Sequence, residues 1–201
     1  TRQFAESLLK EAERLNMLVT DLLDLSRLED PGTIANSIAD LSAVASAELS
    51  QAAPGASAKA IAIKATIDDG VIVRGDDGQL ALMIRNLLDN AVRYTEREGE
   101  ISVQVRIEDQ GAVVRVSDSG VGIPLRDQTR VFERFYRVDE GRSREKGGTG
   151  LGLAIVKHVA DLHGGHVSLS SELGEGSTFT VVLPSAADEP DEDPQTSTGA
   201  M

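Results

Sequence analysis

The sequence contains no cysteine and no tryptophan, and only 3% of its residues are aromatic. Without thiols the chain cannot form disulfides, zinc–thiolate sites or a cysteine nucleophile, and this composition fits a reducing cytoplasm. Because aromatic side chains are few, leucine, isoleucine, valine and alanine must fill the core. The 201 residues, 40% of them hydrophobic, suffice for one domain of about 150 residues with appendages.

Long apolar runs and basic character are missing as well. No stretch approaches the roughly 18–20 apolar residues that a membrane span requires, and no signal peptide pattern is present. The formal net charge is −13. A nucleic-acid partner is therefore not expected, because its phosphates need a basic face, and neither is docking on anionic lipid.

The first region, residues 1–29, has the pattern of an amphipathic helix. Apolar side chains recur there at threes and fours: Phe4, Leu8, Leu15, Leu18, Leu22 and Leu25. This predicts a seam of coiled-coil or bundle type, with an ordinary core helix as the alternative. A solitary helix cannot bury such a stripe, so we expect a partner helix within or between chains. Pro31-Gly32 ends the helix, and its start at Thr1 suggests a piece of a longer protein.

The second region, residues 37–184, alternates between helix and strand patterns. We predict helices at 38–52, 77–94 and 150–163, and strands at 60–67, 71–74, 100–108, 112–118, 166–171 and 177–183. Pro54-Gly55 is expected to break the first of these helices. The pattern predicts an α+β fold, a two-layer sandwich with a mixed sheet covered by helices on one face. Residues 31–36 are a linker, and the acidic tail 185–201 is expected to be disordered.

Two asparagines interrupt the apolar helix predicted at residues 77–94. Asn86 and Asn90 lie four residues apart, so both carboxamides project from one face. Buried carboxamides need polar partners. Mg²⁺ takes oxygen ligands, and an Asn carbonyl supplies one without adding charge beside a triphosphate. The pair indicates a metal–phosphate site or, alternatively, local hydrogen bonds to the backbone and core.

An acidic residue ends one predicted strand and is followed by two glycines. In the run Asp118-Ser119-Gly120-Val121-Gly122-Ile123, the glycines permit a tight turn and close approach to a flat ligand. A buried carboxylate there can accept hydrogen bonds from an exocyclic amine, which reads adenine and rejects guanine. Taken alone, the segment is equally typical of any strand-to-loop turn.

Two further glycine-rich turns follow. Residues 147–153, Gly-Gly-Thr-Gly-Leu-Gly-Leu, run directly into an apolar helix, whose first N–H groups can bind an anion. No Lys-Ser/Thr pair follows the last glycine, so this is not a P-loop; a flexible hinge is the alternative. Residues 174–179 turn into the last strand and fit a plain hairpin almost as well.

Together these segments resemble the ATP-binding domain shared by sensor histidine kinases, DNA gyrase, Hsp90-type chaperones and MutL-type repair proteins. The resemblance covers roughly residues 37–184 and includes an N box, a G1 box, a G2 box and a final glycine turn: Asn86–Tyr94, Asp118–Ile123, Gly147–Leu153 and Gly174–Phe179. Phe132–Tyr136 resembles the F box of the kinase branch. Residues 11–29 resemble the second helix of the kinase dimerisation domain, which assigns residues 1–30 to part of that domain.

The resemblance implies a role for each matching residue. Asn90 would ligate Mg²⁺, Asn86 would lie beside it near the phosphates, and Asp118 would bind the adenine amine. The other implied ATP contacts are Arg93, Tyr94, Gly120, Gly122, Ile123, Gly148, Thr149, Gly150, Leu151, Gly152 and Thr178. The implied cofactors are therefore ATP and Mg²⁺.

Positive charge is concentrated between Pro124 and Gly147, the segment that the resemblance makes a lid over ATP. Because the net field of an acidic protein repels a triphosphate, local cations must offset it. Arg142, Arg144 and Lys146 flank the glycines and are the best phosphate candidates. A solvated charge run is the alternative.

The histidines of the chain are His158, His163 and His166, and none has the neighbouring acid and proline of a phosphoacceptor. We expect all three to be structural, no catalytic residue in this chain, and the acceptor upstream of it. The resemblance implies the ATP-binding catalytic portion of a sensor histidine kinase. Such an enzyme transfers the ATP γ-phosphoryl group to a histidine on a dimerisation helix absent here, for relay to an aspartate of a response-regulator receiver domain.

The resemblance also implies a homodimer through the N-terminal helix and a membrane-anchored bacterial parent, anchored only by segments that this chain lacks. Three other functions share parts of the pattern. A gyrase- or chaperone-like ATPase needs an acid where this chain has Asn86. A degenerate interaction module is disfavoured by Asn90, Asp118 and the glycine turns. A kinase acting on Ser or Thr is disfavoured by the N-terminal helix and residues 132–136.

Overall fold

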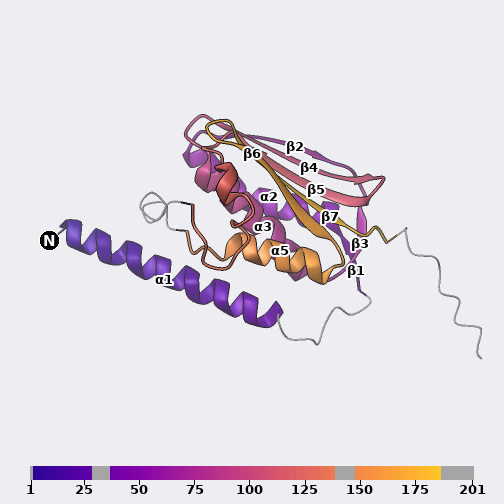
Figure 1. Cartoon of the computed structure of the whole chain (residues 1–201), viewed down its shortest axis with the longest axis horizontal. Helices are drawn as coiled ribbons and strands as arrows, with labels where there is room; N and C mark the ends of the chain where they lie inside the picture. Colours follow the sequence, from indigo (N-terminus) through magenta and orange to yellow (C-terminus); the bar gives the residue numbers. More distant parts are fainter. Residues whose placement is uncertain (1, 29–36, 139–147, 187–201) are drawn as a thin grey trace, which may run out of the picture.

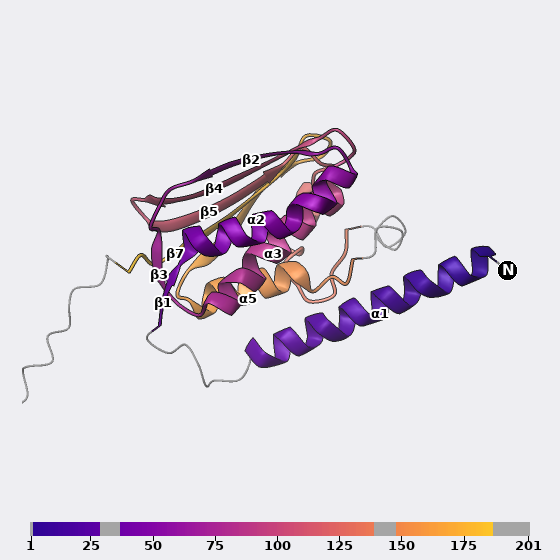
Figure 2. The same cartoon turned by 180° about the vertical axis from the view of Figure 1, so that it is seen from behind.

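The computed structural model describes residues 2–28, 37–138 and 148–186, with the backbone only for residues 2–7, 10, 13 and 14. A long helix lies beside an α/β unit (Figures 1 and 2). In chain order the elements are α1 (Arg2–Leu28), β1 (Ile38–Asp40), α2 (Leu41–Ala58), β2 (Ala62–Ile67), β3 (Ile72–Arg74), α3 (Asp77–Tyr94), β4 (Glu100–Glu108), β5 (Gly111–Asp118), the 3₁₀ turn η1 (Leu125–Asp127), α5 (Gly152–Leu162), β6 (His166–Glu172) and β7 (Gly176–Leu183).

A five-stranded mixed sheet forms one layer, in the order β2-β4-β5-β7-β6. The strand β2 runs parallel to β4, and the other neighbours are antiparallel. Helices α2, α3 and α5 all lie on the same side of the sheet (Figures 1 and 2). This arrangement confirms the predicted α+β class with helices on one face. The short strands β1 and β3 pair separately.

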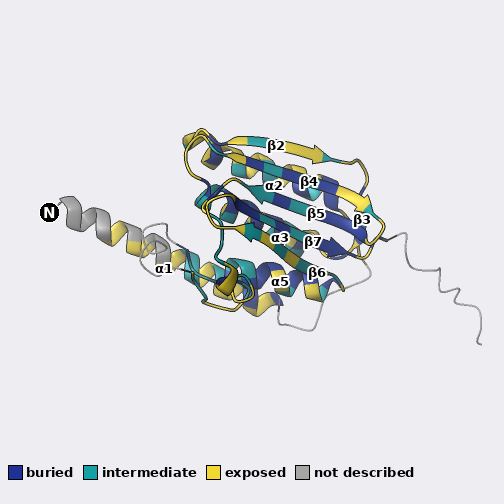
Figure 3. Cartoon of the chain, turned by 45° about the horizontal axis from the view of Figure 1, so that its top comes forward, coloured by how far each residue is buried: buried dark blue, intermediate teal, exposed yellow. Residues whose placement is uncertain are grey.

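The core lies between the sheet and these helices. Figure 3 shows that the central strands β5 and β7 are largely buried, that β4 is buried only in part, and that the edge strand β2 is mostly exposed. From β4, the alternate residues Ile101, Val103 and Val105 point inward and are fully buried. Helix α3 contributes its buried apolar face to the core: Leu80, Met83, Ile84, Leu87, Leu88 and Ala91. Aliphatic side chains thus fill the core, as the scarcity of aromatics predicts.

Helix α3 has the bounds that the sequence predicts, because caps and periodicity agree. The Asp76 carboxylate accepts the N–H of Gln79 at 2.9 Å, which caps the N-terminus. At the other end the backbone of Thr95 turns to an extended conformation, and its hydroxyl donates to the carbonyl of Ala91 at 2.6 Å. Both ends of α3, and therefore its length beside the candidate site, are fixed by these hydrogen bonds.

The prediction for α2 is wrong at both ends. Ile38–Asp40 forms β1, and the helix begins after Asp40, whose carboxylate accepts the N–H of Ala43 at 3.1 Å. The helix then continues through Pro54 to Ala58. A proline inside a helix removes one hydrogen bond, but Ala56, beyond it, is buried in the core. Packing of this last turn therefore outweighs the local preference.

Helix α1 lies alongside α5 (Figures 1 and 2). Leu25 and Leu28 are only 5% and 6% exposed and join the core, so one stripe packs within the chain. Another stripe stays exposed: Leu8, Leu9, Leu15, Val19, Leu22 and Leu23. The burial of Leu25 and Leu28 fits the core-helix alternative, and the bundle with a partner helix stays a prediction. No helix in the described ranges has the length and apolarity needed to cross a bilayer.

The fold extends slightly further at its C-terminal end than the sequence suggests. Ser185, assigned to the tail, pairs with Val73, and the N–H of Ala186 donates to the carbonyl of Ile72 at 3.1 Å. The remaining tail, residues 187–201, and the predicted linker 31–36 lie outside the described residues.

Candidate nucleotide-binding site

The two asparagines of α3 lie on the side of the helix that faces the glycine-rich segment 148–152. Asn86 Nδ2 donates to the carbonyl of Leu82 at 2.8 Å. This leaves Oδ1 directed at Gly152, where an added Cβ would lie 2.6 Å from it. Asn90 is half-buried, and its carboxamide forms no hydrogen bond to any residue that the structure describes.

The end of α3 meets the same segment. A Cβ on Gly148 would lie 3.2 Å from Arg93 Nη1 and 3.5 Å from the Tyr94 hydroxyl. Because Asn86 lies beside Gly152, the half-buried polar face of α3 lines the glycine segment along two turns of helix. The predicted N box and G2 box are therefore brought together.

Asp118 ends β5, opposite Ser177 on β7. Its Oδ1 accepts the N–H of Gly120 at 2.9 Å. Partial burial raises the pKa of the Asp118 carboxyl above its usual value, while the N–H groups of Gly120 and Ser177 lower it. The result is a half-buried acceptor held at a strand end, which suits an amine donor better than a cationic side chain.

The two glycines after Asp118 are required by close backbone approaches. A Cβ on Gly120 would lie 2.6 Å from the carbonyl of Tyr94, so the turn is pressed against the end of α3. Gly122 has a φ of 67°, and its Cβ would overlap the carbonyl of Glu172. Ile123, which follows, donates its N–H to Ser171 Oγ at 2.8 Å and packs against the core.

The last predicted contact, Thr178, is not brought to this cluster. It pairs with Ser117 and donates its hydroxyl to Ser117 Oγ at 2.9 Å. Side chains alternate along a strand, and Phe179 is buried in the core, so Thr178 points to the opposite face of the sheet. Ser177 lies on the side of Asp118 and is buried. The structure therefore favours Ser177 over Thr178 as a neighbour of Asp118. Strand alternation counted back from the buried Phe179 would have indicated Ser177.

The start of the predicted lid is anchored by side chains of the F box. Phe132 packs edge-on against Phe179, with ring centroids 6.4 Å apart. The Tyr136 hydroxyl donates to the buried carboxylate of Asp127 at 2.7 Å, and the Arg130 guanidinium lies 4.2 Å from the centre of the Tyr136 ring. These contacts hold the beginning of the lid against the sheet.

The lid is also tied to the glycine segment. The N–H of Phe135 donates to the carbonyl of Gly150 at 2.8 Å, and Phe135 adopts a left-handed φ of 64°. Non-glycine residues rarely adopt this conformation, and it is found where surrounding contacts impose it. The phosphate candidates Arg142, Arg144 and Lys146, like Gly147, lie outside the described residues.

Helix α5 begins at Gly152, after Leu151 at its N-cap position, without a capping side chain, so the first N–H groups inside this helix lack the partner that a cap supplies. Leu151 itself is fully buried and fixes the turn to the core. Thr149 Oγ1 donates to Asp21 Oδ2 of α1 at 2.6 Å and accepts the N–H of Leu151 at 3.3 Å. Asp21 is a site neighbour that the sequence analysis missed.

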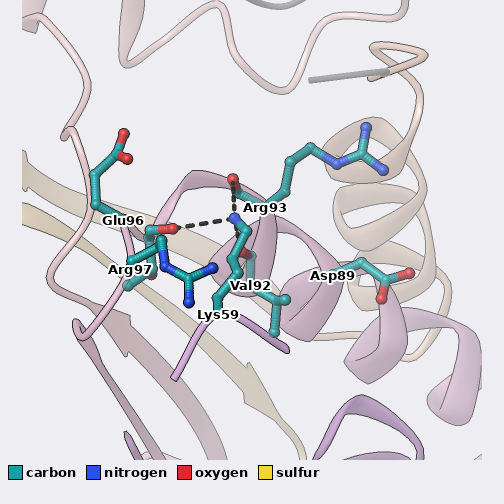
Figure 4. A pocket seen from close by; sticks show the side chains of 7 residues that line it. Lys59, Asp89, Val92, Arg93, Glu96 and Arg97 are labelled. Atoms are coloured by element: carbon teal, nitrogen blue, oxygen red, sulfur yellow. Dashed lines mark hydrogen bonds between the residues drawn. The ribbon is translucent and has the colours of Figure 1, made fainter. Parts of the chain in front are cut away.

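Lys59, which follows α2, is a second neighbour that sequence patterns did not indicate. Its Nζ donates to the main-chain carbonyls of Val92, Arg93 and Thr95 at 2.7, 3.0 and 3.1 Å. Figure 4 shows this ammonium in a cavity of about 540 Å³ on the flank of α3. This cavity shares Arg93 with the candidate site but contains neither asparagine nor any residue of the glycine segment.

Of the three histidines, His163 has contacts that join two elements of the fold. His163 is buried, with Nδ1 2.8 Å from the carbonyl of Val159, and its Nε2 accepts the N–H of Asp76 at 3.4 Å. It thus joins the end of α5 to the start of α3. His158 lies within α5, and His166 is exposed on β6.

Known proteins match both the sequence and the fold. Residues 75–187 match the family described as histidine kinase-, DNA gyrase B-, and HSP90-like ATPase. The chain is 42% identical to the sensor-like histidine kinase SenX3 of Mycolicibacterium smegmatis, over 93% of this chain and 49% of that protein. It is 38% identical to the sensor histidine kinase RppB of Synechocystis, over 87% of this chain and 39% of that protein.

Among solved structures, a mycobacterial sensor histidine kinase, MprB, matches with a TM-score of 0.66 at 31% identity, over 75% of this chain and 98% of that one. Full-length ShkA in complex with AMPPNP matches with a TM-score of 0.72 at 27% identity, over 92% of this chain and 40% of that one. The chain spans about half the length of the curated relative SenX3, 49%. It belongs to the histidine kinase-, DNA gyrase B- and HSP90-like ATPase family, and within that family it is the ATP-binding catalytic portion of a sensor histidine kinase.

Proposed function

We propose that the chain binds Mg·ATP between α3, the turn after β5 and the glycine segment that begins α5. In the intact protein it would transfer the γ-phosphoryl group to a histidine on a dimerisation helix outside this chain. The observation that carries the proposal is the convergence of α3 on the glycine segment, with Asn86 beside Gly152 and Arg93 beside Gly148.

Each part of the site suits one part of the nucleotide. The half-buried Asp118 carboxylate would accept the exocyclic amine of adenine, with Ser177 beside it. The carbonyl oxygens of Asn90 and Asn86 would face the metal ion, which prefers oxygen ligands. Arg93 and the uncapped N–H groups at the start of α5 would bind phosphate oxygens.

Phosphoryl transfer requires little covalent chemistry from this domain. Its task is to hold the γ-phosphoryl group in line with the attacking imidazole nitrogen and to offset the charge that develops on it. The phosphohistidine would then pass the group to an aspartate of a response-regulator receiver domain. The exposed leucine stripe of α1 would complete a helical bundle with a second protomer, as the assignment of residues 1–30 to a dimerisation domain requires.

Calorimetric titration of the chain with ATP tests the site. We expect micromolar-to-millimolar affinity, about 4–8 kcal/mol of binding free energy, lost in Asp118→Asn. Asn90→Ala should bind ATP with a weaker dependence on Mg²⁺, measured with the ion and with a chelator. The matched control is Asp109→Asn, which removes the same charge at the other end of β5 and should bind like the wild type.

A folded wild-type chain that shows no ATP binding under these conditions would overturn the proposal. If ATP binds, a polypeptide carrying the histidine-bearing dimerisation helix can be added with labelled ATP. Acid-labile label on that helix is the expected result, whereas acid-stable label would indicate transfer to a hydroxyl group instead.

A further inference from the structure

Helix α1 reaches the glycine segment through one carboxylate. Asp21 Oδ2 accepts the Thr149 hydroxyl at 2.6 Å, although the two residues are 128 positions apart in the chain. The following turns of α1 are fixed at the same place, because Leu25 and Leu28 are buried in the core. Figures 1 and 2 show α1 running alongside α5, the helix that this segment begins. The contact is therefore part of a packed junction.

The surroundings of Asp21 connect it to the phosphate candidates. Burial raises the pKa of the Asp21 carboxyl, and the Thr149 hydrogen bond lowers it. Asp24 and Asp89 raise this pKa further, whereas Arg93 lowers it. Arg93 is the cation that lies beside Gly148. One carboxylate of α1 thus shares its two favourable neighbours with the proposed phosphate site.

Thr149 cannot donate a hydrogen bond to Asp21 and to a nucleotide phosphate at the same time. A threonine hydroxyl carries a single proton, so it donates either to Asp21 or to a phosphate oxygen. A triphosphate entering beside Gly148 would also place negative charge near Asp21, next to Arg93. Two anions at short separation in a partly buried site repel each other strongly. A phosphate bound beside Thr149 therefore disfavours the Asp21 carboxylate at the same place, and the Asp21 carboxylate disfavours the phosphate.

We propose that Asp21 and an ATP phosphate compete for the hydroxyl of Thr149, so that docking of α1 weakens nucleotide binding and nucleotide binding weakens docking of α1. This inference rests on the proposed nucleotide site. The coupling is reciprocal, because an effect of one ligand on a second is matched by an equal effect in return. Asp21 is a regulatory residue of the helix and takes no part in the phosphoryl transfer itself.

The first test compares ATP affinities of the whole chain by calorimetry. Asp21→Asn and Asp21→Ala should bind ATP about tenfold more tightly than the wild type, within the usual range of coupling between two sites. The matched control is Asp24→Asn, which removes the same charge from the same helix but touches Arg27 rather than Thr149. It should bind ATP within about twofold of the wild type, because a weak surface pair contributes little.

The second test follows the helix itself. The chain has no cysteine, so Ser26→Cys on α1 and Lys157→Cys on α5, both exposed, can carry a pair of distance-reporting labels. ATP should lengthen the mean distance between the labels in the wild type. In Asp21→Ala the distance should already be longer and should respond little to ATP.

The outcomes separate this inference from the proposed function. If the wild type binds ATP but Asp21→Asn binds no more tightly than Asp24→Asn, the competition is refuted and the nucleotide site stands. An unchanged label distance on saturation with ATP refutes it equally. If no variant binds ATP, the proposed function fails and the competition fails with it.

Discussion

The main-chain carbonyl of Glu172 occupies the space into which a Cβ on Gly122 would project. The turn after Asp118 is therefore packed directly against the hairpin between β6 and β7. The proposed adenine site has a backbone wall on this side, and that wall tolerates no side chain at position 122.

Gly122→Ala should destabilise the fold well beyond the cost of its backbone conformation. Gly70 offers a matched control, because its φ of 68° equals the 67° of Gly122 and no atom lies within 4 Å of its added Cβ. Gly70→Ala should cost about 1–2 kcal/mol for the left-handed conformation alone. Chemical denaturation should show a distinctly larger loss for Gly122→Ala, and equal losses would contradict the overlap with Glu172.

Gly152→Ala should separate stability from binding. Gly152 is the first residue of α5, and alanine favours a helix over glycine by about 1 kcal/mol. The new methyl group would press on Asn86 Oδ1, 2.6 Å away, and turn that carboxamide. We expect a melting temperature no lower than that of the wild type together with weaker Mg·ATP binding. Unchanged affinity would show that the orientation of Asn86 is not needed for binding.

The pH dependence of stability should report Asp118. Burial, the largest effect, raises the folded-state pKa of this carboxyl above its ordinary value of 3.8. As pH rises between these two values, the unfolded chain loses its proton first, so the folded state loses stability. Asp118→Asn cannot titrate. Its unfolding free energy minus that of the wild type should therefore increase with pH across this window and then level off.

Denaturant unfolding at a series of pH values measures that difference, in which the contributions of the other titrating groups cancel. A difference that is independent of pH, or that decreases as pH rises, would contradict a raised pKa for Asp118.

The ion pair between α2 and α3 should respond unequally to removal of its two partners. Both Glu48 oxygens accept from Arg85, at 2.9 and 3.0 Å, and the Glu48 side chain is only 4% exposed, against 49% for Arg85. Arg85→Ala leaves the buried Glu48 carboxylate without its cationic partner and should lower the free energy of unfolding by about 2–4 kcal/mol. Glu48→Ala leaves a guanidinium that water can reach, and should cost about 1–2 kcal/mol.

The exposed pair of Lys64 and Glu100 is the control for these two variants. Glu100→Ala should cost less than about 1 kcal/mol, as is usual for solvated pairs. Chemical denaturation of the three variants in one buffer tests the order, and equal costs for Arg85→Ala and Glu48→Ala would contradict the role of burial.

Local patterns predicted those elements for which several signals agree. In α3, the apolar periodicity indicates the helix, and its bounds are confirmed; the carboxylate of Asp76 caps it in the structure. In α2 the local signal at Pro54 indicates an end, but burial of Ala56 holds the helix together beyond it. The sequence alone does not reveal that burial, because it depends on packing between segments that are distant in the chain.

In the candidate site, too, local patterns indicate some residues, whereas others depend on contacts between distant segments. Asp118 and Gly120 lie within one short run, so residue types and spacing indicate their geometry. Strand alternation would have selected Ser177 rather than Thr178, had it been counted from the buried Phe179. The Asp21–Thr149 contact joins residues 128 positions apart. No local pattern carries that information, since it arises only when α1 packs on α5.

Lys59, which donates hydrogen bonds to the last carbonyls of α3, affects the electrostatic potential that a polyanion would meet at this end of the helix. A helix carries about half a negative charge at its C-terminal end, and this is the end from which Arg93 and Tyr94 extend toward Gly148. The Lys59 ammonium lies against three of those carbonyls and cancels that charge locally. In a protein with a net charge of −13, this residue after α2 thus reduces the repulsion between the end of α3 and the triphosphate proposed to bind there. Acetylation or loss of this amine would restore the repulsion without altering any residue proposed to contact the nucleotide.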